Sequence, residues 1–268
     1  MKLKSPFLVK PHTRVRLSRL DTASTGGFKS SDAVEPLLVK HREALDARQE
    51  LFYASRQKAM LIVLQGMDTA GKDGTIRHIF TGINPQGCDV TPFKVPTLLE
   101  ASHDFLWRVH AAVPPRGMIG IFNRSHYEDV LSPVVHKVIS RKAARRHIDE
   151  INAFEAMLAE SDVVILKFFL HISAAEQKRR LQTRIDTPDK QWKLAQSDFK
   201  ERKFWDGYTE AYEEIFARTS HKHAPWFVIP SDYKWYRNLA VSQIVLEAMQ
   251  GLKLKYPAST VDPSSIKL

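Results

Sequence analysis

Short apolar runs alternate with longer amphipathic stretches along the chain. Runs this short and this apolar are typical of parallel strands that are buried on both faces. They lie at residues 60–64, 117–122, 163–172 and 226–229, with a weaker candidate at 90–93. Their alternation with helical stretches predicts βαβ units around a central parallel sheet, and therefore an α/β/α sandwich.

The amphipathic stretches carry one apolar stripe each, as helices that cover a sheet do. We expect them at about 35–57, 74–81, 98–112, 144–160 and 233–252. Residues 174–219 differ, because they are dense in charged and aromatic side chains and are broken at Thr187-Pro188. This segment is predicted to be a mobile helical lid in two halves rather than a part that packs on the sheet.

The two ends of the chain differ from its middle. Six Lys or Arg residues precede the first acidic residue, Asp21, and a TASTGG stretch follows. We therefore predict a poorly packed basic arm over residues 1–34, one large domain over 35–257, and a C-terminal tail over 258–268. A length of 268 residues suits a single large domain with an inserted lid.

Charge narrows the choice of partner. Forty Lys and Arg against thirty Asp and Glu leave a formal net charge of +10, which favours a polyanion such as nucleic acid, a phosphate polymer or nucleotides. A single cysteine, Cys88, cannot form an intrachain disulfide. The apolar runs are far shorter than the roughly 20 residues that cross a bilayer. We expect a cytoplasmic protein without a membrane partner.

The strongest motif is GMDTAGK, which runs from Gly66 to Lys72 between a predicted buried strand and a predicted helix. In a loop of the form GxxxxGK, the glycines let backbone N–H groups point at phosphate oxygens. The helix N-terminus adds its positive dipole end, and the lysine reaches the transferring phosphate. The motif and its position together predict a phosphate-binding loop.

One position of this loop departs from the usual pattern. The Ser or Thr hydroxyl that normally follows the lysine and ligates magnesium is replaced by Asp73. Asp68, inside the loop, is a candidate ligand instead, because Mg²⁺ prefers hard oxygen ligands beside bridging phosphates. The alternative is that Asp68 and Asp73 simply complement the helix dipole.

A second polar cluster, NRSHYED, follows the predicted strand at 117–122. Because the carboxyl ends of parallel strands face one crevice, this cluster should lie beside the phosphate loop. Arg124 could clamp a phosphate with two hydrogen bonds, and Glu128 could face the acceptor. Asn123 occupies the strand end, where a carboxylate that binds magnesium often lies. The alternative is an ordinary solvated loop.

Several blocks of the chain occur in the order found in one enzyme family. They are GMDTAGKDGTI, NPQGCDVTPFKVPT, SHDFLWRVH, IGIFNRSHYEDVL, LKFFLHIS, the WK of the lid and APWFVIPSDYKWYRNL. Over residues 35–257 the sequence resembles the polyphosphate kinase 2 family, phosphate-loop kinases that transfer phosphate between inorganic polyphosphate and nucleotides. The resemblance implies a thymidylate-kinase-like fold with a helical lid.

The resemblance also implies roles for individual residues. Asp68, Lys72 and Arg124 would be catalytic, with Asp68 binding Mg²⁺, or Mn²⁺ in its place. Further phosphate contacts would come from the loop and the lid: Gly66, Ala70, Gly71, Asp73, Gly74, Arg179, Arg184, Lys193 and Arg202. The nucleotide would contact Thr75, Asn123 and Glu128.

The NRSHYED block resembles the subgroup that phosphorylates both nucleoside mono- and diphosphates. The expected partners are therefore polyphosphate and AMP, ADP or ATP, with guanine nucleotides as further substrates and a homodimer or homotetramer as the assembly. Two alternatives remain open. One is an ATP-dependent nucleotide kinase, which the same loop would support. The other is a nucleic-acid-binding protein, which the RKAARRH cluster at 141–147 and the aromatic residues of the lid would suit.

Overall fold

The computed structural model describes residues 3–262, 264 and 266. These residues form one five-stranded sheet in the order β2-β3-β1-β4-β5, and every strand pair in it is parallel. The strands are β1 (Ala59–Gln65), β2 (Cys88–Pro92), β3 (Ile119–Asn123), β4 (Val163–His171) and β5 (Trp226–Pro230). All five predicted strands, including the weaker candidate that became β2, are confirmed.

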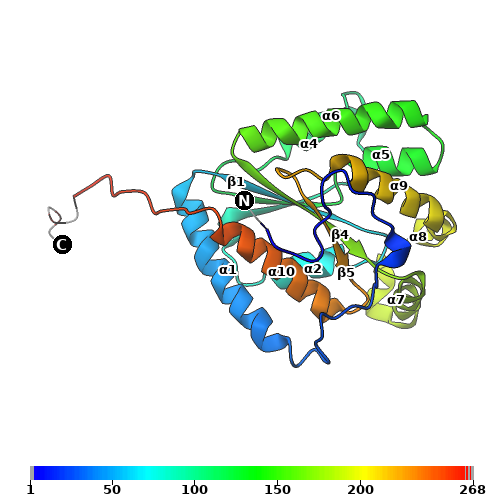
Figure 1. The fold of residues 1–268 in the computed structure, drawn as a ribbon, viewed down its shortest axis with the longest axis horizontal. Helices are drawn as coiled ribbons and strands as arrows, with labels where there is room; N and C mark the ends of the chain where they lie inside the picture. Colours follow the sequence, from blue (N-terminus) through cyan, green and yellow to red (C-terminus); the bar gives the residue numbers. More distant parts are fainter. Residues whose placement is uncertain (1–2, 263, 265, 267–268) are drawn as a thin grey trace.

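Helices cover both faces of the sheet (Figure 1). One face carries α1 (Glu35–Ser55), α2 (Lys72–Ile79) and α10 (Lys234–Gln250). The other carries α4 (Trp107–Ala111), α5 (Glu128–Val135), α6 (Arg141–Glu160) and α9 (Trp205–Thr219). The predicted α/β/α sandwich is confirmed. Within the described part of the chain, every helix is too short or too polar to cross a bilayer.

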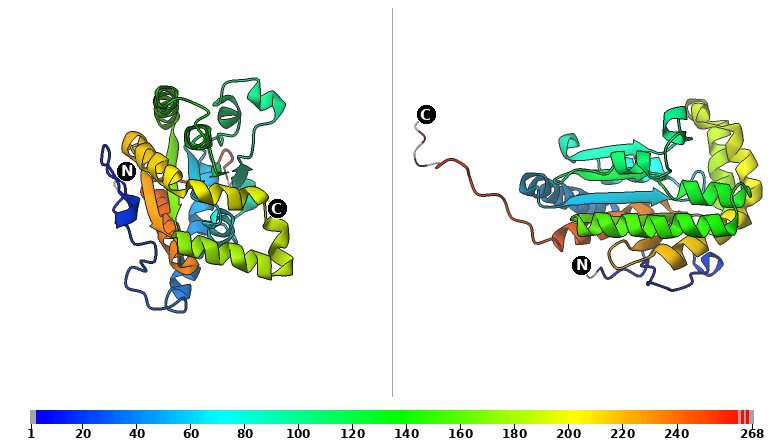
Figure 2. Two further views of the ribbon diagram at one scale, coloured as in Figure 1. Left: turned by 90° about the vertical axis from the view of Figure 1, so that its right-hand side faces the viewer. Right: turned by 90° about the horizontal axis from the view of Figure 1, so that it is seen from above.

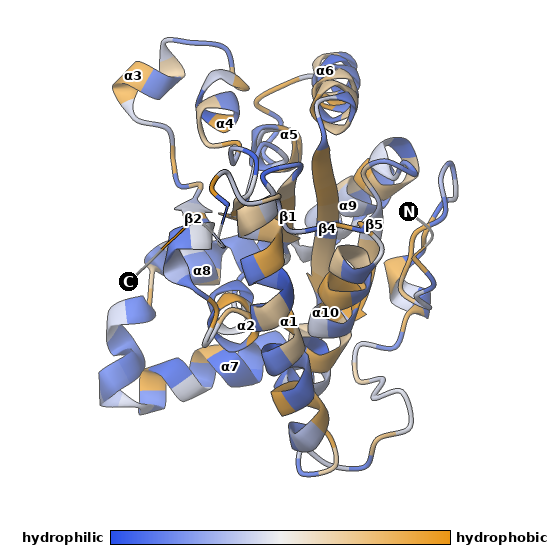
Figure 3. Ribbon diagram, turned by 90° about the vertical axis from the view of Figure 1, so that its left-hand side faces the viewer, coloured by the Kyte–Doolittle hydropathy of each residue, from blue (hydrophilic) through white to orange (hydrophobic). Residues whose placement is uncertain are grey.

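The central strands form the core because their side chains are apolar on both faces. All seven residues of β1 are buried, and β1 lies between β3 and β4. Figure 3 shows β1 and β4 as hydrophobic ribbons, whereas α7 (Ala174–Asp186) and α8 (Gln196–Glu201) are largely hydrophilic. The two polar helices lie beyond the carboxyl ends of the strands (Figure 2), where the predicted crevice should be.

The segment predicted as one helix over 98–112 is two short helices, α3 (Leu98–Ala101) and α4. Thr97 and Glu100 form a capping box that starts α3. Asp104 then accepts a hydrogen bond from the backbone N–H of Leu106 at 3.0 Å. An aspartate that bonds the backbone two residues ahead forms a turn that competes with helix, and this turn explains why the single predicted helix was wrong.

The lid also differs from its prediction. Between α7 and α9 the chain forms two 3-10 turns and α8, at Pro188–Lys193, Arg202–Phe204 and Gln196–Glu201. In α9, Tyr212, Ile215 and Phe216 are almost fully buried and belong to the main core. Spacings of three and four residues place these side chains on one helix face. The expectation that all of 174–219 stays off the sheet was therefore wrong for α9.

The N-terminal arm is packed, and the prediction of a loose arm was wrong. Val9 donates its backbone N–H to Trp226 at 2.9 Å, and Val228 donates to Phe7 at 2.9 Å. The arm thus pairs antiparallel with the outer edge of β5. Leu17 in the turn that follows is only 2% exposed. Apolar side chains at these positions outweigh the basic ones between them, which remain at the surface.

The C-terminal tail predicted over 258–268 is exposed at every residue that the structure describes there. Figure 1 shows it leading away from the domain after α10. Residues 263, 265, 267 and 268 of this tail, and residues 1 and 2 of the arm, lie outside the described residues. The described tail therefore contributes little to the core.

The packed arm makes a prediction about stability. We expect Leu17→Ala to lower the free energy of unfolding by about 2–5 kcal/mol, because it removes a buried leucine side chain. The matched control is Leu20→Ala, at a position that is 42% exposed, where a change within about 0.5 kcal/mol is expected. Denaturant unfolding measures both. Equal small effects would show that the arm contributes nothing to the folded state.

Candidate functional site

The phosphate loop joins the end of β1 to the start of α2. Gly71, at the N-terminus of α2, has a φ of +105°, a conformation that favours glycine. A Cβ on Gly71 would collide with the guanidinium of Arg237. A Cβ on Gly66 would lie 2.9 Å from both the Ala70 Cβ and the Leu170 carbonyl oxygen. Both glycines of the motif are therefore required by close packing around the loop.

Lys72 lies folded over this loop. Its Nζ donates to the carbonyl oxygen of Gly66 at 2.9 Å. Burial lowers the pKa of Lys72, and the nearby charge of Arg124 lowers it further, while Asp68, Glu128 and Asp73 act in the opposite direction. The structure thus brings these five predicted site residues into one electrostatic neighbourhood at the ends of β1 and β3.

Arg124 and Asp68 form an ion pair across the crevice. Nη2 of Arg124 lies 2.9 Å from Oδ1 of Asp68, with the two side chains 43% and 22% exposed. Arg124 has a φ of +65° and Thr69 in the loop has a φ of +64°. Left-handed backbone at residues other than glycine is strained and clusters at functional sites. Two predicted catalytic residues are therefore paired directly, next to strained backbone.

Asp68 is suited to be one ligand of a metal ion whose other ligands come from substrate phosphates. Among the described residues, no group of three or more His, Cys, Asp or Glu side chains could hold a metal ion. Mg²⁺ is commonly bound by one or two carboxylates together with substrate phosphates, and one partly exposed carboxylate in the loop fits that arrangement. Arg124 must then share Asp68 with the ion or release it.

Asp73 and Asn123 pair with each other. Nδ2 of Asn123 donates to Oδ1 of Asp73 at 2.7 Å, so the amide at the end of β3 occupies the carboxylate that replaces the usual hydroxyl. Thr75 is fully buried, and its hydroxyl donates to the carbonyl oxygen of Gly71 at 3.1 Å. In this structure the side chain of Thr75 stabilises the first turn of α2, and its contact with a nucleotide stays a prediction.

Glu128 begins α5 and faces the same cluster. Burial raises the pKa of Glu128, while the charges of Arg124 and Lys72 oppose that rise. The carboxylate of Glu128 therefore offsets part of the positive charge of Arg124 and Lys72. The charge of Glu128 is therefore a candidate for determining whether the acceptor nucleotide carries one phosphate or two.

The four predicted lid cations have different surroundings. Arg202 donates to Oε1 of Gln177 at 2.6 Å, and Gln177 in turn contacts the phosphate loop. Arg184 lies 3.4 Å from Asp198, and Arg179 is paired with Glu176 at 2.6 Å. Lys193 lies over the ring of Trp192. Arg202 is linked to the loop through one residue, Gln177, and Arg179 through two, Glu176 and Arg180.

Three residues that the sequence did not single out contact the loop directly. Gln177, Arg180 and Arg237 donate to its carbonyl oxygens. Arg180 and Arg237 are 7% and 1% exposed. The sequence offered a weak signal: Gln177 and Arg180 lie three residues apart in a helix, so they share a face. Nothing in the run KRR indicates which arginine faces inward.

A buried ionic network lies beneath NRSHYED. Lys167 in β4 donates to Glu155 at 2.5 Å, to the Tyr127 hydroxyl at 2.9 Å and to the Thr219 carbonyl oxygen at 2.8 Å. The Tyr127 hydroxyl and His126 Nε2 lie 2.9 Å and 3.2 Å from Oε1 of Glu155. The network anchors the middle of NRSHYED, so that Arg124 and Glu128 extend from a fixed turn.

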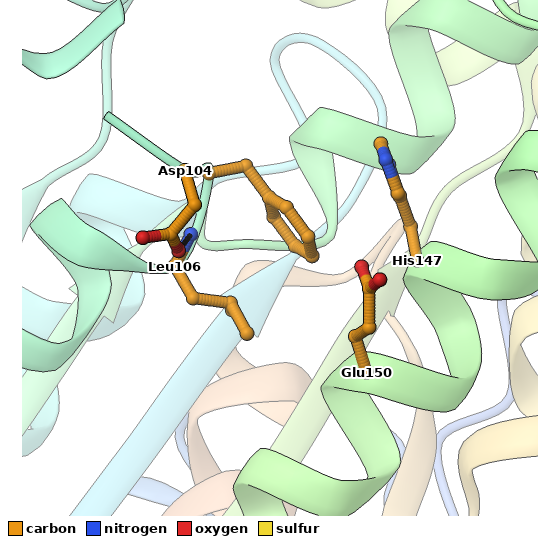
Figure 4. A pocket seen from close by; sticks show the side chains of 5 residues that line it. Asp104, Leu106, His147 and Glu150 are labelled. Atoms are coloured by element: carbon orange, nitrogen blue, oxygen red, sulfur yellow. Dashed lines mark hydrogen bonds between the residues drawn. The ribbon is translucent and has the colours of Figure 1, made fainter. Parts of the chain in front are cut away.

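Two hollows are present, of which the first adjoins β4 through Phe169 and His171. One, of about 340 Å³, is walled by the arm, by Met67 of the loop and by the first turn of α9. The other, of about 510 Å³, is lined by Asp104, Phe105, Leu106, His147 and Glu150 (Figure 4). No loop residue lines the second hollow, and its two carboxylates would repel a polyanion. The loop, rather than this hollow, is therefore the candidate phosphate site.

Glu128 gives a prediction about pH. Its pKa in the folded protein is raised above the ordinary 4.5, so the folded state is weakened as pH rises through the interval between these two values. Glu128→Gln should raise Tm at neutral pH, and this gain should disappear below about pH 4.5. Thermal unfolding across a pH series measures it.

The control for this series is Glu50→Gln, at an exposed position of α1, which should leave Tm unchanged at every pH. A Tm of Glu128→Gln that equals or falls below that of the wild type at neutral pH would contradict the inference that burial disfavours this charge.

Comparison with known proteins agrees with this geometry. The model of the polyphosphate kinase 2 family matches residues 29–257. An AMP/ADP-polyphosphate phosphotransferase of Meiothermus ruber is 47% identical over 253 residues, 94% of each chain. An ADP-polyphosphate phosphotransferase of Rhodopseudomonas palustris is 41% identical over 273 residues, 97% of this chain and 94% of its own.

A solved structure is also similar. The crystal structure of polyphosphate kinase 2 from Arthrobacter aurescens TC1 superposes with a TM-score of 0.91 at 40% identity, covering 96% of this chain and 95% of that one. Both the sequence match and this superposition extend over nearly the whole domain, including the loop, the strand ends and the lid. The chain belongs to the polyphosphate kinase 2 family.

Proposed function

We propose that this enzyme transfers the terminal phosphate of inorganic polyphosphate to AMP and ADP, forming ADP and ATP, and that the reaction is reversible. The observation that carries the proposal is the cluster of Lys72, Arg124 and Asp68 around the phosphate loop, which the cationic lid borders. The names of the relatives from Meiothermus ruber and Rhodopseudomonas palustris support the same reaction.

Phosphoryl transfer leaves little covalent chemistry to a protein, so the site must align donor and acceptor and neutralise charge. Backbone N–H groups of the loop and the start of α2 would hold the phosphate oxygens. Lys72 would move its Nζ from the Gly66 carbonyl oxygen to the transferring phosphate. Arg124 would do the same from Asp68, with two N–H groups on one phosphate.

We propose Asp68 as the ligand that holds Mg²⁺, or Mn²⁺, together with substrate phosphates. Such an ion, when bound, would neutralise charge on the substrate phosphates. Asn123 and Glu128 would face the nucleotide from the end of β3 and the start of α5. Glu128 is half-buried, and burial disfavours its charged form. Its carboxyl group would therefore tolerate acceptors that carry one phosphate or two, and both AMP and ADP would bind.

The cationic lid would shield the reaction from water. Arg179, Arg184, Lys193 and Arg202 would line the path of the polymer beyond the loop. Water must be excluded, because hydrolysis would consume polyphosphate without forming a nucleotide. A polymer needs a longer cationic path than ATP does, and the net charge of +10 supports this assignment.

The activity test uses polyphosphate, a divalent ion and, in separate reactions, AMP, ADP, GMP and GDP. AMP should be consumed as ADP and then ATP appear, and guanine nucleotides should react too. Lys72→Ala and Asp68→Asn should lower kcat/KM by about a hundredfold or more, because each removes charge stabilisation at the transferring group.

The controls are Lys40→Ala and Asp46→Asn, two matched changes at exposed positions of α1, which should leave kcat/KM unchanged. Affinity that rises with polymer length would agree with the proposal. Turnover with ATP as donor and none with polyphosphate would instead identify an ATP-dependent nucleotide kinase. Near-normal synthesis by folded Lys72→Ala would contradict the proposed mechanism.

We also propose a homodimer or homotetramer in the cytoplasm; the single cysteine is compatible with a reducing compartment. Val95, Leu98 and Leu99 are 90%, 94% and 62% exposed on the segment that follows the edge strand β2. Exposed apolar clusters mark interaction surfaces. Light scattering should give a multiple of the 30.7 kDa chain mass, and Leu98→Glu should reduce it. A monomer would contradict the proposal.

A further inference from the structure

The carbonyl oxygens of three consecutive loop residues are held from the side of the lid. Gln177 donates Nε2 to the Asp68 carbonyl oxygen at 3.0 Å. Arg180 donates Nη1 to the carbonyl oxygens of Thr69 at 3.0 Å and Ala70 at 2.9 Å. Both donors belong to the first two turns of α7. The first two turns of α7, where the lid begins, therefore hold the phosphate loop by hydrogen bonds.

The same arginine joins the loop to a second turn. Nη2 of Arg180 donates to the carbonyl oxygens of Ser231 at 2.5 Å and Asp232 at 3.0 Å, at the turn between β5 and α10. Its Nε lies 2.6 Å from Glu176. One guanidinium thus uses its planar fork to bind four carbonyl oxygens and one carboxylate, which an ammonium group could not do.

The orientation of these carbonyl groups decides where the loop N–H groups point. In a trans peptide unit, the C=O and the following N–H point in opposite directions. Holding the carbonyls of Asp68 and Ala70 toward α7 therefore aims the N–H groups of Thr69 and Gly71 the other way. Within the described residues, neither of these N–H groups makes a hydrogen bond, whereas the Ala70 N–H closes a turn on Met67 at 3.0 Å.

From this geometry we propose that Arg180 and Gln177 are positioning residues for phosphate binding: they fix the loop carbonyls so that its free N–H groups face the polyphosphate. They act through the loop and touch no substrate. Arg202 joins them through Oε1 of Gln177 at 2.6 Å. Movement of the lid is then confined to the segment after the first two turns of α7 and before the packed part of α9.

Arg237 in α10 supports the same assignment. It donates to the Ala70 carbonyl oxygen at 3.2 Å and to its neighbour Asn238 at 2.8 Å, and no described carboxylate lies within ion-pair distance of it. Two buried guanidinium groups thus converge on the Ala70 carbonyl. Glu176 compensates the charge of Arg180, whereas the charge of Arg237 beneath the loop has no carboxylate partner among the described residues and favours an anion above the loop.

The test begins with hydrogen exchange, which needs no substrate. In Arg180→Lys, the hydrogen-bonded backbone amide of Ala70, within residues 66–73, should exchange about tenfold faster than in the wild type, while the amides of β1 keep their rate. Gln177→Met is the second variant and should speed exchange in the same segment. Arg218→Lys is the matched control, because Arg218 forms an exposed pair with Glu214 in α9. Unchanged exchange of 66–73 in both variants would overturn the proposal.

Kinetics add a readout that depends on the proposed function. In Arg180→Lys, KM for polyphosphate should rise about tenfold while KM for AMP changes by less than about twofold. A purely structural role would lower kcat per mole of protein and leave both KM values unchanged, which would overturn the positioning role. If the wild type turns over neither AMP nor ADP, the proposed function fails, and hydrogen exchange still decides the proposal.

Discussion

The ion pair between Lys167 and Glu155 is the constraint on which the site depends. Both side chains are fully buried, so neither charge can remain without the other. Lys167 comes from β4 and Glu155 from α6. Their shared partner Tyr127 belongs to NRSHYED, and a further acceptor of Lys167, the Thr219 carbonyl oxygen, lies at the end of α9. One buried pair therefore sets the relative positions of the sheet, the NRSHYED cluster after β3 and the end of α9.

Around this fixed base, the charged groups of the site are already paired with one another. Arg124 pairs with Asp68, Asn123 with Asp73, and Lys72 with a carbonyl of its own loop. In the proposed function, phosphates or a metal ion would replace these contacts. Binding would then exchange internal partners for substrate oxygens, and in the free protein the strained loop avoids exposing uncompensated charges.

The sequence predicted most of the fold because the strands are apolar on both faces and the loop motif has few alternatives. It failed where local polar contacts or distant packing decide. Asp104 forms a turn that divides one expected helix into two, and hydrophobic periodicity does not detect such a turn. The burial of Leu17 and Tyr212 depends on strands far away in sequence. The cluster of Lys72, Arg124 and Asp68 was predictable from strand ends, but the inward arginines were not, since charge usually marks a surface.

The pairing of the arm with β5 joins residues 7–9 to residues 226–228. These contacts span nearly the whole chain, so they carry a large loop-closure entropy and form late in folding. During synthesis the arm emerges well before β5 and has no strand to pair with until β5 has left the ribosome. A segment made early is thus among the last to find its place, and its apolar residues must stay unpaired throughout that interval.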